Sequence, residues 1–512
     1  MHRRTALKIL SGLALLPSVR GVEAFAKSAP SAGRQIGINL AGLSYWGNEQ
    51  PFSNLSMAAS PWRMQPETAP FSWTYPLPPM TAEKYPLSVP RGSYLETFLI
   101  HTPHRDHLPV DLVVQYDGDG RLDYTGAAVT KRRRGEDVIR DLRQGGAICA
   151  RLVATDARDP LRNLRLYPEN AVPQASETFR QPFLDRWKPM SALRFMDWMD
   201  TNNSKIVSWS DRPAFARFGQ SEGGVALEYM VELANTLRIA PWFTLPHRAD
   251  DDHVRRFAEQ VRRDLDPALP VYVEYSNEVW NGMFEQAAYA RQEGLRRNLS
   301  VHDFEAQLRF YAQRSSEVID IWEKAFGSDK DRVLGVYASQ AGIGWASETI
   351  LSWGNARKHA DVLAVAPYFG GSIGSPEQAA TVSRWTLDEL FEALDADIDG
   401  ANKVMIETQA SIAKTFGVGL VAYEGGQHLA GHSGVENNEK IDQLFRSANR
   451  DRRMAGLYRK HLNNWWAAGG QTYVLYNSMG SYSKWGSWGL LETESSAADS
   501  PKWETVRTFL EG

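Results

Sequence analysis

The stretch Val271–Trp280, VYVEYSNEVW, decides the fold of this chain. It begins as a run of β-branched and aromatic residues, which is typical of a buried strand, and it then reaches the polar pair Asn277 and Glu278. A second stretch, Gly419–His428 (GLVAYEGGQH), follows the same plan, because its short apolar run leads to Glu424. Strands that end on functional side chains are typical of α/β barrels, whose active sites lie at the carboxyl ends of the strands.

Side chains alternate along a strand, so each stretch also predicts which residues share a face. Glu274 and Glu278 fall on one face of the first strand, with Glu278 at the rim and Glu274 deeper. Ala422 and Glu424 fall on one face of the second strand, and the small Ala422 is expected to leave space below the carboxylate. We therefore expect both rim glutamates at the mouth of one barrel.

Eight short apolar runs of this kind can be recognised, with room for helices between most of them. Alternating strands and helices predict parallel strands joined by crossover helices, and eight repeats predict an α/β fold, a closed (β/α)8 TIM barrel. The alternative is a doubly wound sheet, which would carry a Gly-rich phosphate loop after its first strand, and the sequence has none there. The predicted strands are Gln35–Leu40, Ala192–Asp197, Ala240–Leu245, Val271–Ser276, Val333–Ala338, Val362–Ala366, Val418–Tyr423 and Thr472–Tyr476; Asn438–Ala468 is among the helical stretches.

The interval between the first two strands is far longer than one helix requires. It contains an irregular stretch rich in Pro, Trp and Met, Ala59–Lys84, followed by strand-like runs within Tyr94–Tyr167 that are separated by DGDG and RQGG turns. This pattern predicts a β-rich, sandwich-like insertion. The predicted division is an export signal at 1–26, the first barrel strand at 34–48, the insertion at 49–185 and the rest of the catalytic barrel at 186–512.

The first residues have the pattern of an export signal rather than of a folded element. Arg3 and Arg4 precede a short apolar run, Ile9–Leu16, and Ala24–Ala26 provides a cleavage site after Ala26. The paired arginines resemble a twin-arginine signal, and the apolar run is too short to span a bilayer. We expect a periplasmic or secreted protein that has no membrane partner after the signal is removed.

The composition and the remaining motifs limit the class of protein and the partners that the chain can have. The 512 residues are 43% hydrophobic and 23% charged, which suits a large globular protein, and the net charge of −4 argues against a nucleic-acid partner. The run Asp250–His253 is typical of a helix start rather than of a metal site. No zinc spacing and no Ser-His-Asp order is found, so we expect neither a metal nor another cofactor.

Two carboxylates at one barrel mouth can break a glycosidic bond, with one as acid and base and the other as nucleophile. An Asn-Glu pair at the end of the fourth strand and a Glu at the end of the seventh resemble clan A of the glycoside hydrolases, the superfamily of many cellulases, mannanases and β-galactosidases. The resemblance covers the barrel and leaves the insertion out. It implies that Glu278 is the acid/base, that Glu424 is the nucleophile and that Asn277 binds the sugar 2-hydroxyl.

The resemblance also suggests three supporting residues on other strands. Arg194, in ALRFMDW, resembles the arginine that keeps the nucleophile ionised, although it could equally pair with Glu274 or Asp197 inside the barrel. His247 follows the third strand, where clan members often place a site histidine, and the alternative is a plain loop histidine. Tyr368 follows the sixth strand and could donate to the nucleophile or serve only in packing.

The eighth strand departs from the clan pattern. Clan members present a tryptophan there as a platform for the sugar, whereas this strand reads TYVLYN and the tryptophans come later. Trp485 and Trp488, in SKWGSWG, are the candidates for that role.

The sequence thus predicts a retaining glycoside hydrolase that cleaves a β-linked glycan, with an oligo- or polysaccharide as its partner and endo action preferred. The alternatives are a carbohydrate-binding protein that has lost catalysis, and a transglycosylase or phosphorylase that uses the same carboxylates. The sugar, the linkage, the role of the insertion and the oligomeric state stay open.

Overall fold

The computed structural model describes residues 34–101, 108–143, 146–172 and 177–511, so the predicted export signal lies outside the described residues. Within these ranges eight parallel strands close into a barrel, each paired with the next along the chain and the last paired with the first. The predicted (β/α)8 barrel with a β-rich insertion after its first strand is confirmed. The barrel strands are β1 (Ile36–Asn39), β10 (Ala192–Arg194), β11 (Ala240–Leu245), β12 (Val271–Tyr275), β13 (Val333–Ala338), β14 (Val362–Val365), β15 (Gly419–Ala422) and β16 (Tyr473–Leu475).

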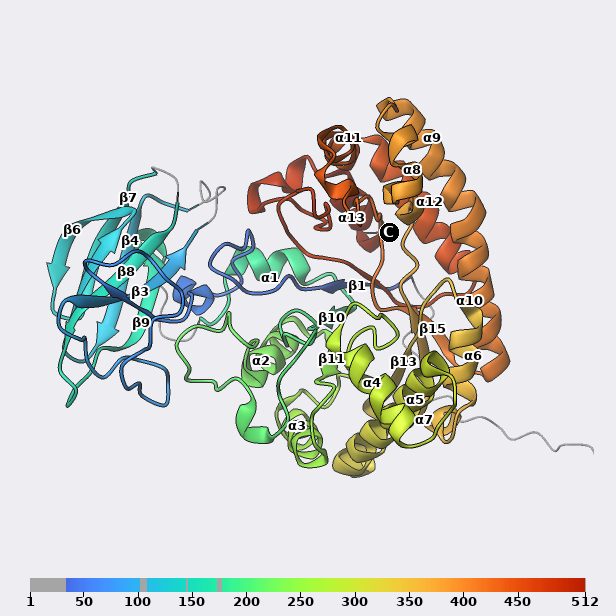
Figure 1. Cartoon of the computed structure of the whole chain (residues 1–512), viewed down its shortest axis with the longest axis horizontal. Helices are drawn as coiled ribbons and strands as arrows, with labels where there is room; N and C mark the ends of the chain where they lie inside the picture. Colours follow the sequence, from blue (N-terminus) through green and yellow to red (C-terminus); the bar gives the residue numbers. More distant parts are fainter. Residues whose placement is uncertain (1–33, 102–107, 144–145, 173–176, 512) are drawn as a thin grey trace, which may run out of the picture.

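Helices surround the barrel, as crossover connections between parallel strands require (Figure 1). Several begin on capping side chains that the sequence makes visible: Asp250 accepts a hydrogen bond from the His253 backbone N–H at the start of α3. The helices are α1 (Gln181–Trp187), α2 (Leu227–Leu237), α3 (Asp251–Asp264), α4 (Glu285–Arg296), α5 (Asp303–Phe326), α6 (Gly344–Ser352), α7 (Ala356–His359), α8 (Pro376–Val382), α9 (Leu387–Asp397), α10 (Lys403–Phe416), α11 (Glu439–Arg450), α12 (Arg453–Ala467) and α13 (Pro501–Glu511).

The predicted helical stretch Asn438–Ala468 is two helices rather than one. The backbone of Asp451 is extended, which ends α11, and the Asp451 carboxylate then accepts a hydrogen bond from the backbone N–H of Arg453 at 2.9 Å. A short acidic side chain that binds the following backbone competes with helix continuation. The amphipathic sequence pattern continues on both sides of Asp451, so the pattern alone does not show that α11 ends there.

The barrel interior is filled by side chains from alternating strand positions. Trp242 of β11 stacks on Tyr272 of β12, with ring centroids 4.8 Å apart, and its indole N–H donates to Glu274 at 2.8 Å. Arg194 of β10 lies in the same layer and pairs with Glu274. The interior is therefore polar toward the carboxyl ends of the strands, where an ordinary barrel core would be aliphatic.

The insertion between β1 and β10 forms two four-stranded antiparallel sheets to one side of the barrel (Figure 1). Their apolar faces share one core, which includes Leu95 and Leu152 from one sheet and Val114 and Leu166 from the other. The first sheet has the order β2-β3-β8-β5 and the second β6-β7-β4-β9, with β2 (Arg63–Pro66), β3 (Ser93–Ile100), β4 (Asp111–Asp117), β5 (Gly120–Thr125), β6 (Ala127–Arg133), β7 (Glu136–Asp141), β8 (Ile148–Thr155) and β9 (Arg162–Pro168).

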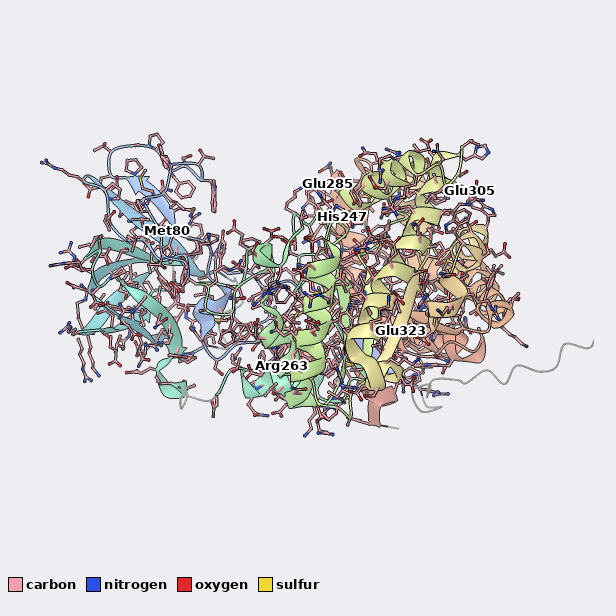
Figure 2. All side chains as sticks on the ribbon, turned by 90° about the horizontal axis from the view of Figure 1, so that it is seen from below. Met80, His247, Arg263, Glu285, Glu305 and Glu323 are labelled. Carbon is pink, nitrogen blue, oxygen red and sulfur yellow. The ribbon has the colours of Figure 1, made fainter. Side chains whose placement is uncertain are left out.

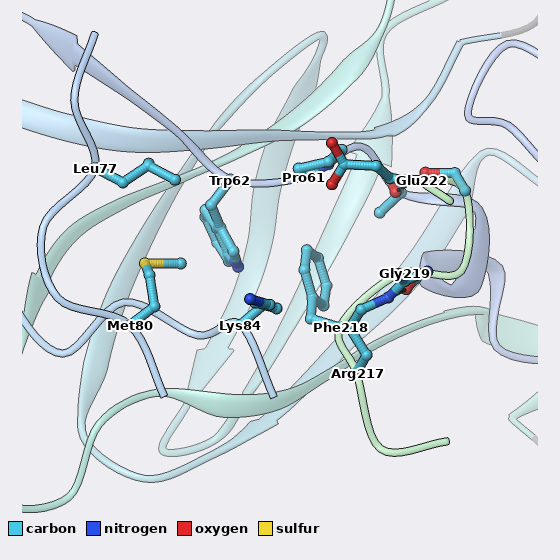
Figure 3. Close-up of a pocket in the computed structure, with 11 residues that line it drawn as sticks. Pro61, Trp62, Leu77, Met80, Lys84, Arg217, Phe218, Gly219 and Glu222 are labelled. Atoms are coloured by element: carbon cyan, nitrogen blue, oxygen red, sulfur yellow. Dashed lines mark hydrogen bonds between the residues drawn. The ribbon is translucent and has the colours of Figure 1, made fainter. Parts of the chain in front are cut away.

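The insertion meets the barrel at the loop that precedes α2. Phe218 of that loop stacks on Trp62 of the insertion, with centroids 5.4 Å apart, and its backbone N–H donates to the carbonyl of Glu83 at 2.8 Å. Beside this ring pair lies a cavity of about 250 Å³, which Met80 and Lys84 also line (Figure 3). The two units are thus joined by aromatic packing as well as by the chain itself.

None of the helices in the described ranges combines the length and the apolar character that a membrane crossing requires.

Candidate active site

The segment after β12 turns two side chains toward the mouth of the barrel. The strand ends at Tyr275, and Ser276 and Glu278 then adopt left-handed backbone angles, with φ of 61° and 42°. The predicted alternation therefore holds only as far as Glu274. Beyond it, the left-handed residues bring neighbouring side chains, Asn277 and Glu278, to the same cluster, which regular strand geometry would not allow.

The segment after β15 delivers the second carboxylate, and here the predicted facing residue was wrong. Tyr423, and not Ala422, faces the interior, because its ring lies over the guanidinium of Arg194 at 5.0 Å. Ala422 pairs instead with Tyr473, whose hydroxyl contacts His461 of α12 outside the barrel. Tyr423 thus occupies the interior-facing position that was expected for Ala422.

Arg194 links the two strand ends. Its guanidinium is fully buried and donates to both oxygens of Glu274, the closer at 2.9 Å, and to Oδ1 of Asn277 at 2.8 Å. Its Nη1 donates to Oε1 of Glu424 at 3.0 Å and to Oδ1 of Asn39 at 3.1 Å. Arg194 thus pairs with Glu274 and with Glu424 at once, so the structure contains the contact that each interpretation of the sequence expected.

Each rim carboxylate is held by its own hydroxyl donor. Tyr423 donates to Oε1 of Glu278 at 3.0 Å, and the amide of Asn281 donates to its Oε2 at 2.8 Å. Tyr368, which follows β14, donates to Oε2 of Glu424 at 3.0 Å. The structure thus brings the two glutamates together at one barrel mouth, with a fixed orientation for each.

Burial raises the pKa of both carboxyls. The pKa of Glu424 rises to about 8, first because of burial and second because of the charge on Glu278, while Arg194 and the Tyr368 hydroxyl act in the opposite direction. Burial also raises the pKa of Glu278. Two buried carboxyls that repel each other cannot both ionise easily, so the pair retains a shared proton near neutral pH.

The donors around the pair indicate where that proton resides. A cation favours the charged form of the carboxylate it touches, and Arg194 contacts Glu424 directly while Glu278 is bound by the neutral groups of Asn281 and Tyr423. Protonation of Glu278 also removes the charge that helps to raise the pKa of Glu424. The arrangement therefore favours a neutral Glu278 beside an ionised Glu424.

An aromatic wall closes one side of the pair. The ring of Trp488 lies edge-on to Tyr368, His428 and Tyr476, with centroid distances of 5.9, 4.9 and 6.1 Å. Trp485 comes from the same loop, but it is 65% exposed and contacts Lys484, with the Nζ atom 4.7 Å from its ring. Of the two tryptophans considered, the structure brings Trp488 to the cluster and leaves Trp485 on the outside.

His247 lies apart from this cluster. Its ring packs edge-on to Tyr289 of α4 at 5.3 Å, and its charged neighbours are Arg248 and Lys205. Glu285 also acts on it, and Figure 2 shows the side chains of His247 and Glu285 near each other. Burial lowers the pKa of His247 to about 4, so the ring is neutral at ordinary pH.

A cavity of about 350 Å³ lies beyond the ends of β1 and β10 and is lined by Asp197, Asp200 and Trp46. Burial raises the pKa of Asp197 to about 6, and its carboxylate accepts a hydrogen bond from Tyr476. The charge of Asp197 also acts on Glu424. This cavity therefore adjoins the pair of glutamates.

Sequence reasoning gave no role to Tyr423, Asn281, Asn39 and Tyr476. Tyr423 directly precedes Glu424, and Asn281 follows Glu278 by three residues. Their closeness in sequence to the two glutamates was the signal that could have identified them. Asn39 and Tyr476 lie at the carboxyl ends of β1 and β16, and equal treatment of all eight strand ends would have included them.

Among the described residues, no group of three or more His, Cys, Asp and Glu side chains is arranged to hold a metal ion. The site is instead built from carboxyl, amide, phenol and guanidinium groups. Its components suit proton transfer and nucleophilic attack by a carboxylate.

No protein-family model matches the sequence, and none of the curated proteins matches it. Among solved structures, a broad specificity GH5-4 endoglucanase from Clostridium acetobutylicum is 14% identical, with a TM-score of 0.39, over 67% of this chain and 92% of that one. An endo-β-1,4-mannanase from Thermotoga petrophila is 16% identical, with a TM-score of 0.32, over 64% and 72%.

A modular endo-β-1,4-mannanase from Cellulomonas fimi is 11% identical, with a TM-score of 0.32, over 61% of this chain and 62% of its own length. The chain thus spans less than two thirds of that enzyme. The closed barrel is defined by the strand pairing of this chain itself, and these likenesses carry no information about the function of the chain.

Proposed function

We propose that the chain is a retaining glycoside hydrolase of the clan A type, with Glu278 as acid/base and Glu424 as nucleophile. The observation that carries this proposal is the asymmetry of the pair: the rim carboxyls Glu278 and Glu424 follow β12 and β15, and of these two the cation of Arg194 contacts only Glu424. That asymmetry is what a double displacement needs, since one carboxyl must start protonated and the other ionised.

In the first step the Glu278 proton passes to the glycosidic oxygen while a Glu424 oxygen bonds to the anomeric carbon. The bond between that carbon and the leaving oxygen breaks, and a glycosyl ester of Glu424 forms. The Glu424 charge is then gone, so the pKa of Glu278 falls and its carboxylate can act as a base. Glu278 takes a proton from water, the water oxygen bonds to the anomeric carbon, and Glu424 leaves as a carboxylate.

Asn277 is placed to position the sugar rather than to transfer a proton. Its Oδ1 accepts from Arg194 at 2.8 Å, and its Nδ2 donates to Oδ1 of Asn202 at 3.1 Å, which fixes the direction of the amide. An amide nitrogen carries two N–H groups, so a second donor remains for the substrate. We assign to it the hydroxyl beside the reacting carbon.

The remaining parts of the proposal follow the sequence. A cavity of about 350 Å³ next to the pair suits a polymer that passes through the mouth, so we propose endo action on a polysaccharide. The paired arginines and the alanine-rich cleavage pattern support export to the periplasm or beyond.

Azide rescue tests the two roles separately. Glu424→Ala and Glu278→Ala are assayed on an aryl β-glycoside whose leaving group needs no proton, with and without azide. We expect azide to restore product in both variants, as the α-glycosyl azide with Glu424→Ala and as the β-glycosyl azide with Glu278→Ala.

Glu274→Gln is the matched control, because Glu274 is a fully buried carboxyl that pairs with Arg194 but does not face the rim. It is expected to lose activity without any azide product. If either rim variant keeps the wild-type rate, its role is refuted. If wild-type protein cleaves no aryl glycoside or glycan while it still binds glycans, the chain is a binding protein.

A further inference from the structure

The insertion presents aromatic rings to solvent close to the catalytic mouth. Trp73 is 59% exposed and Phe71 is 52% exposed, on the loop that follows β2, and Trp46 is 60% exposed, after β1. Large aromatic side chains normally gain free energy by burial, so exposed rings that gather in one region indicate a binding surface.

These rings are connected to the candidate active site. Trp46 lines the cavity that also holds Asp197 and Asp200, beside the glutamate pair. Its neighbour Tyr45 packs on Phe98 of β3, with ring centroids 4.9 Å apart, and Phe98 in turn meets Trp73 at 5.9 Å. A continuous series of aromatic rings therefore leads from the catalytic mouth to the surface of the insertion.

A buried cation fixes the outer part of this series. The guanidinium carbon of Arg63 lies 3.9 Å from the ring centres of both Trp73 and Phe98, and 5.4 Å from that of Phe71. Arg63 is only 6% exposed, and within the described ranges none of its side-chain nitrogens has a hydrogen-bond partner. A buried guanidinium without hydrogen-bond acceptors is costly, and the aromatic faces together with the charge of Glu96 compensate it.

Two hydrogen bonds fix the backbone of the loop that carries Phe71 and Trp73. The amide of Gln65 donates to the carbonyl of Ser72 at 2.6 Å, and the Ser72 N–H donates back to Gln65 at 3.2 Å. Ser72 stands between Phe71 and Trp73, so both rings are anchored through it. The exposed rings are therefore pre-organised, which lowers the entropy cost of binding a flexible ligand.

We propose that the insertion extends the substrate groove, and that Trp46, Trp73 and Phe71 form a platform for distal units of a neutral glycan chain. The link to catalysis rests on the proposed function. Sugar rings offer apolar C–H faces to aromatic planes, and their hydroxyls suit the carboxylates of Asp197 and Asp200 in the adjoining cavity. These two carboxylates, in a chain of net charge −4, disfavour an acidic polymer.

Affinity electrophoresis tests the platform without any need for catalysis. The full chain is run in native gels that contain hydroxyethylcellulose, galactomannan, arabinoxylan or, as the acidic polymer, alginate. We expect retardation in at least one neutral polymer, and a dissociation constant about tenfold weaker for Trp73→Ala, as the loss of one stacking contact predicts. Trp73→Tyr keeps a ring over Arg63 and is expected to retain most of the binding.

Trp345→Ala is the matched control, since it removes a tryptophan that is 48% exposed on α6, across the barrel from the insertion (Figure 1). It is expected to bind like the wild type. Retardation in no neutral gel, retardation in alginate alone, or equal retardation of Trp73→Ala overturns the platform.

Steady-state kinetics distinguish the binding role of the platform from the proposed hydrolysis at the glutamate pair. In Trp73→Ala, kcat/KM on the retarding polymer is expected to fall about tenfold while kcat/KM on an aryl monoglycoside stays within about twofold. An equal loss on both substrates would contradict a distal role. A wild type that binds polymer but cleaves neither substrate would refute the hydrolase and leave the platform supported by its binding.

Discussion

The two rim carboxyls differ most clearly in the tyrosine hydroxyl that donates a hydrogen bond to each of them. Tyr368 donates to Glu424 and lowers its pKa, and Tyr423 donates to Glu278 and lowers the pKa of that group. A hydrogen bond to the charged form of a carboxyl favours ionisation, so its removal raises the pKa. The two donors therefore control different limbs of a pH profile.

We expect Tyr368→Phe to move the acid limb of kcat/KM to higher pH, because an ionised Glu424 is then harder to form. Tyr423→Phe is the matched variant and should move the alkaline limb to higher pH, because Glu278 then keeps its proton longer. Each variant is expected to lose roughly tenfold to a hundredfold in kcat/KM. Profiles on one aryl glycoside check this, and the same limb moving in both variants would contradict the assigned roles.

The proton that Glu278 keeps also makes the stability of the fold depend on pH. Burial raises the pKa of Glu278 above its ordinary value of 4.5, so the folded state keeps a proton that the unfolded state releases. The stability that this proton provides is complete below about pH 4.5 and is lost as the pH rises through the raised pKa of Glu278. Glu278→Gln removes this titration and keeps the size of the side chain.

The free energy of unfolding of Glu278→Gln should therefore exceed that of the wild type by a margin that grows from pH 5 to pH 8, by more than about 1 kcal/mol. Urea unfolding at several pH values measures the margin. Glu407→Gln, at an exposed position of α10, is the control and should show no such growth. A constant margin for Glu278→Gln would show that this carboxyl is ionised throughout, which would contradict its role as the acid.

At the scale of elements, the sequence was most informative about the strands. Parallel strands that are buried on both faces appear as short apolar runs, and the runs at β11 and β13 have the bounds that were predicted. The geometry beyond the strand ends could not be read in the same way. The left-handed angles of Ser276 and Glu278 depend on tertiary contacts, so the alternation rule failed where the functional residues begin.

The segment after β12 carries backbone strain that a glycine would relieve. Ser276 is fully buried at φ 61°, and its hydroxyl has no partner among the residues the structure describes. We expect Ser276→Gly to stabilise the protein by about 1 kcal/mol and to lower kcat/KM several-fold, because Asn277 and Glu278 become less restrained.

Urea unfolding and steady-state kinetics on the same preparation measure the two effects. Lys84→Gly is the control, since Lys84 has φ 69° at an exposed position of the insertion, far along the chain from β12. It should gain stability without a loss of kcat/KM. A Ser276→Gly variant with full activity would show that the left-handed turn does not orient Glu278.

At the scale of the whole molecule, the chain has two hydrophobic cores, one in the barrel and one between the sheets of the insertion. The sequence predicted a β-rich insertion from an interval too long for one helix, but composition gave no information on how it meets the barrel. That contact depends on Phe218, which belongs to the barrel part of the sequence and packs in the core of the insertion. A contact between residues so far apart in the sequence leaves no local sequence pattern from which it could be predicted.

Phe218 therefore couples the two cores, and its removal should separate them. Its ring stacks on Trp62 with centroids 5.4 Å apart and packs at a tilt on Tyr85 with centroids 5.2 Å apart. Truncation of a buried phenylalanine costs about 3–5 kcal/mol. We expect Phe218→Ala to split one calorimetric transition into two, because the sheets lose their main apolar contact with the loop before α2. Phe445→Ala, a buried ring of α11 in the barrel core, should lower the melting temperature without a split. If both variants unfold in one transition, the insertion is coupled to the barrel by other contacts, such as the hydrogen bonds between the same loop and the carbonyls of Met57 and Ala59.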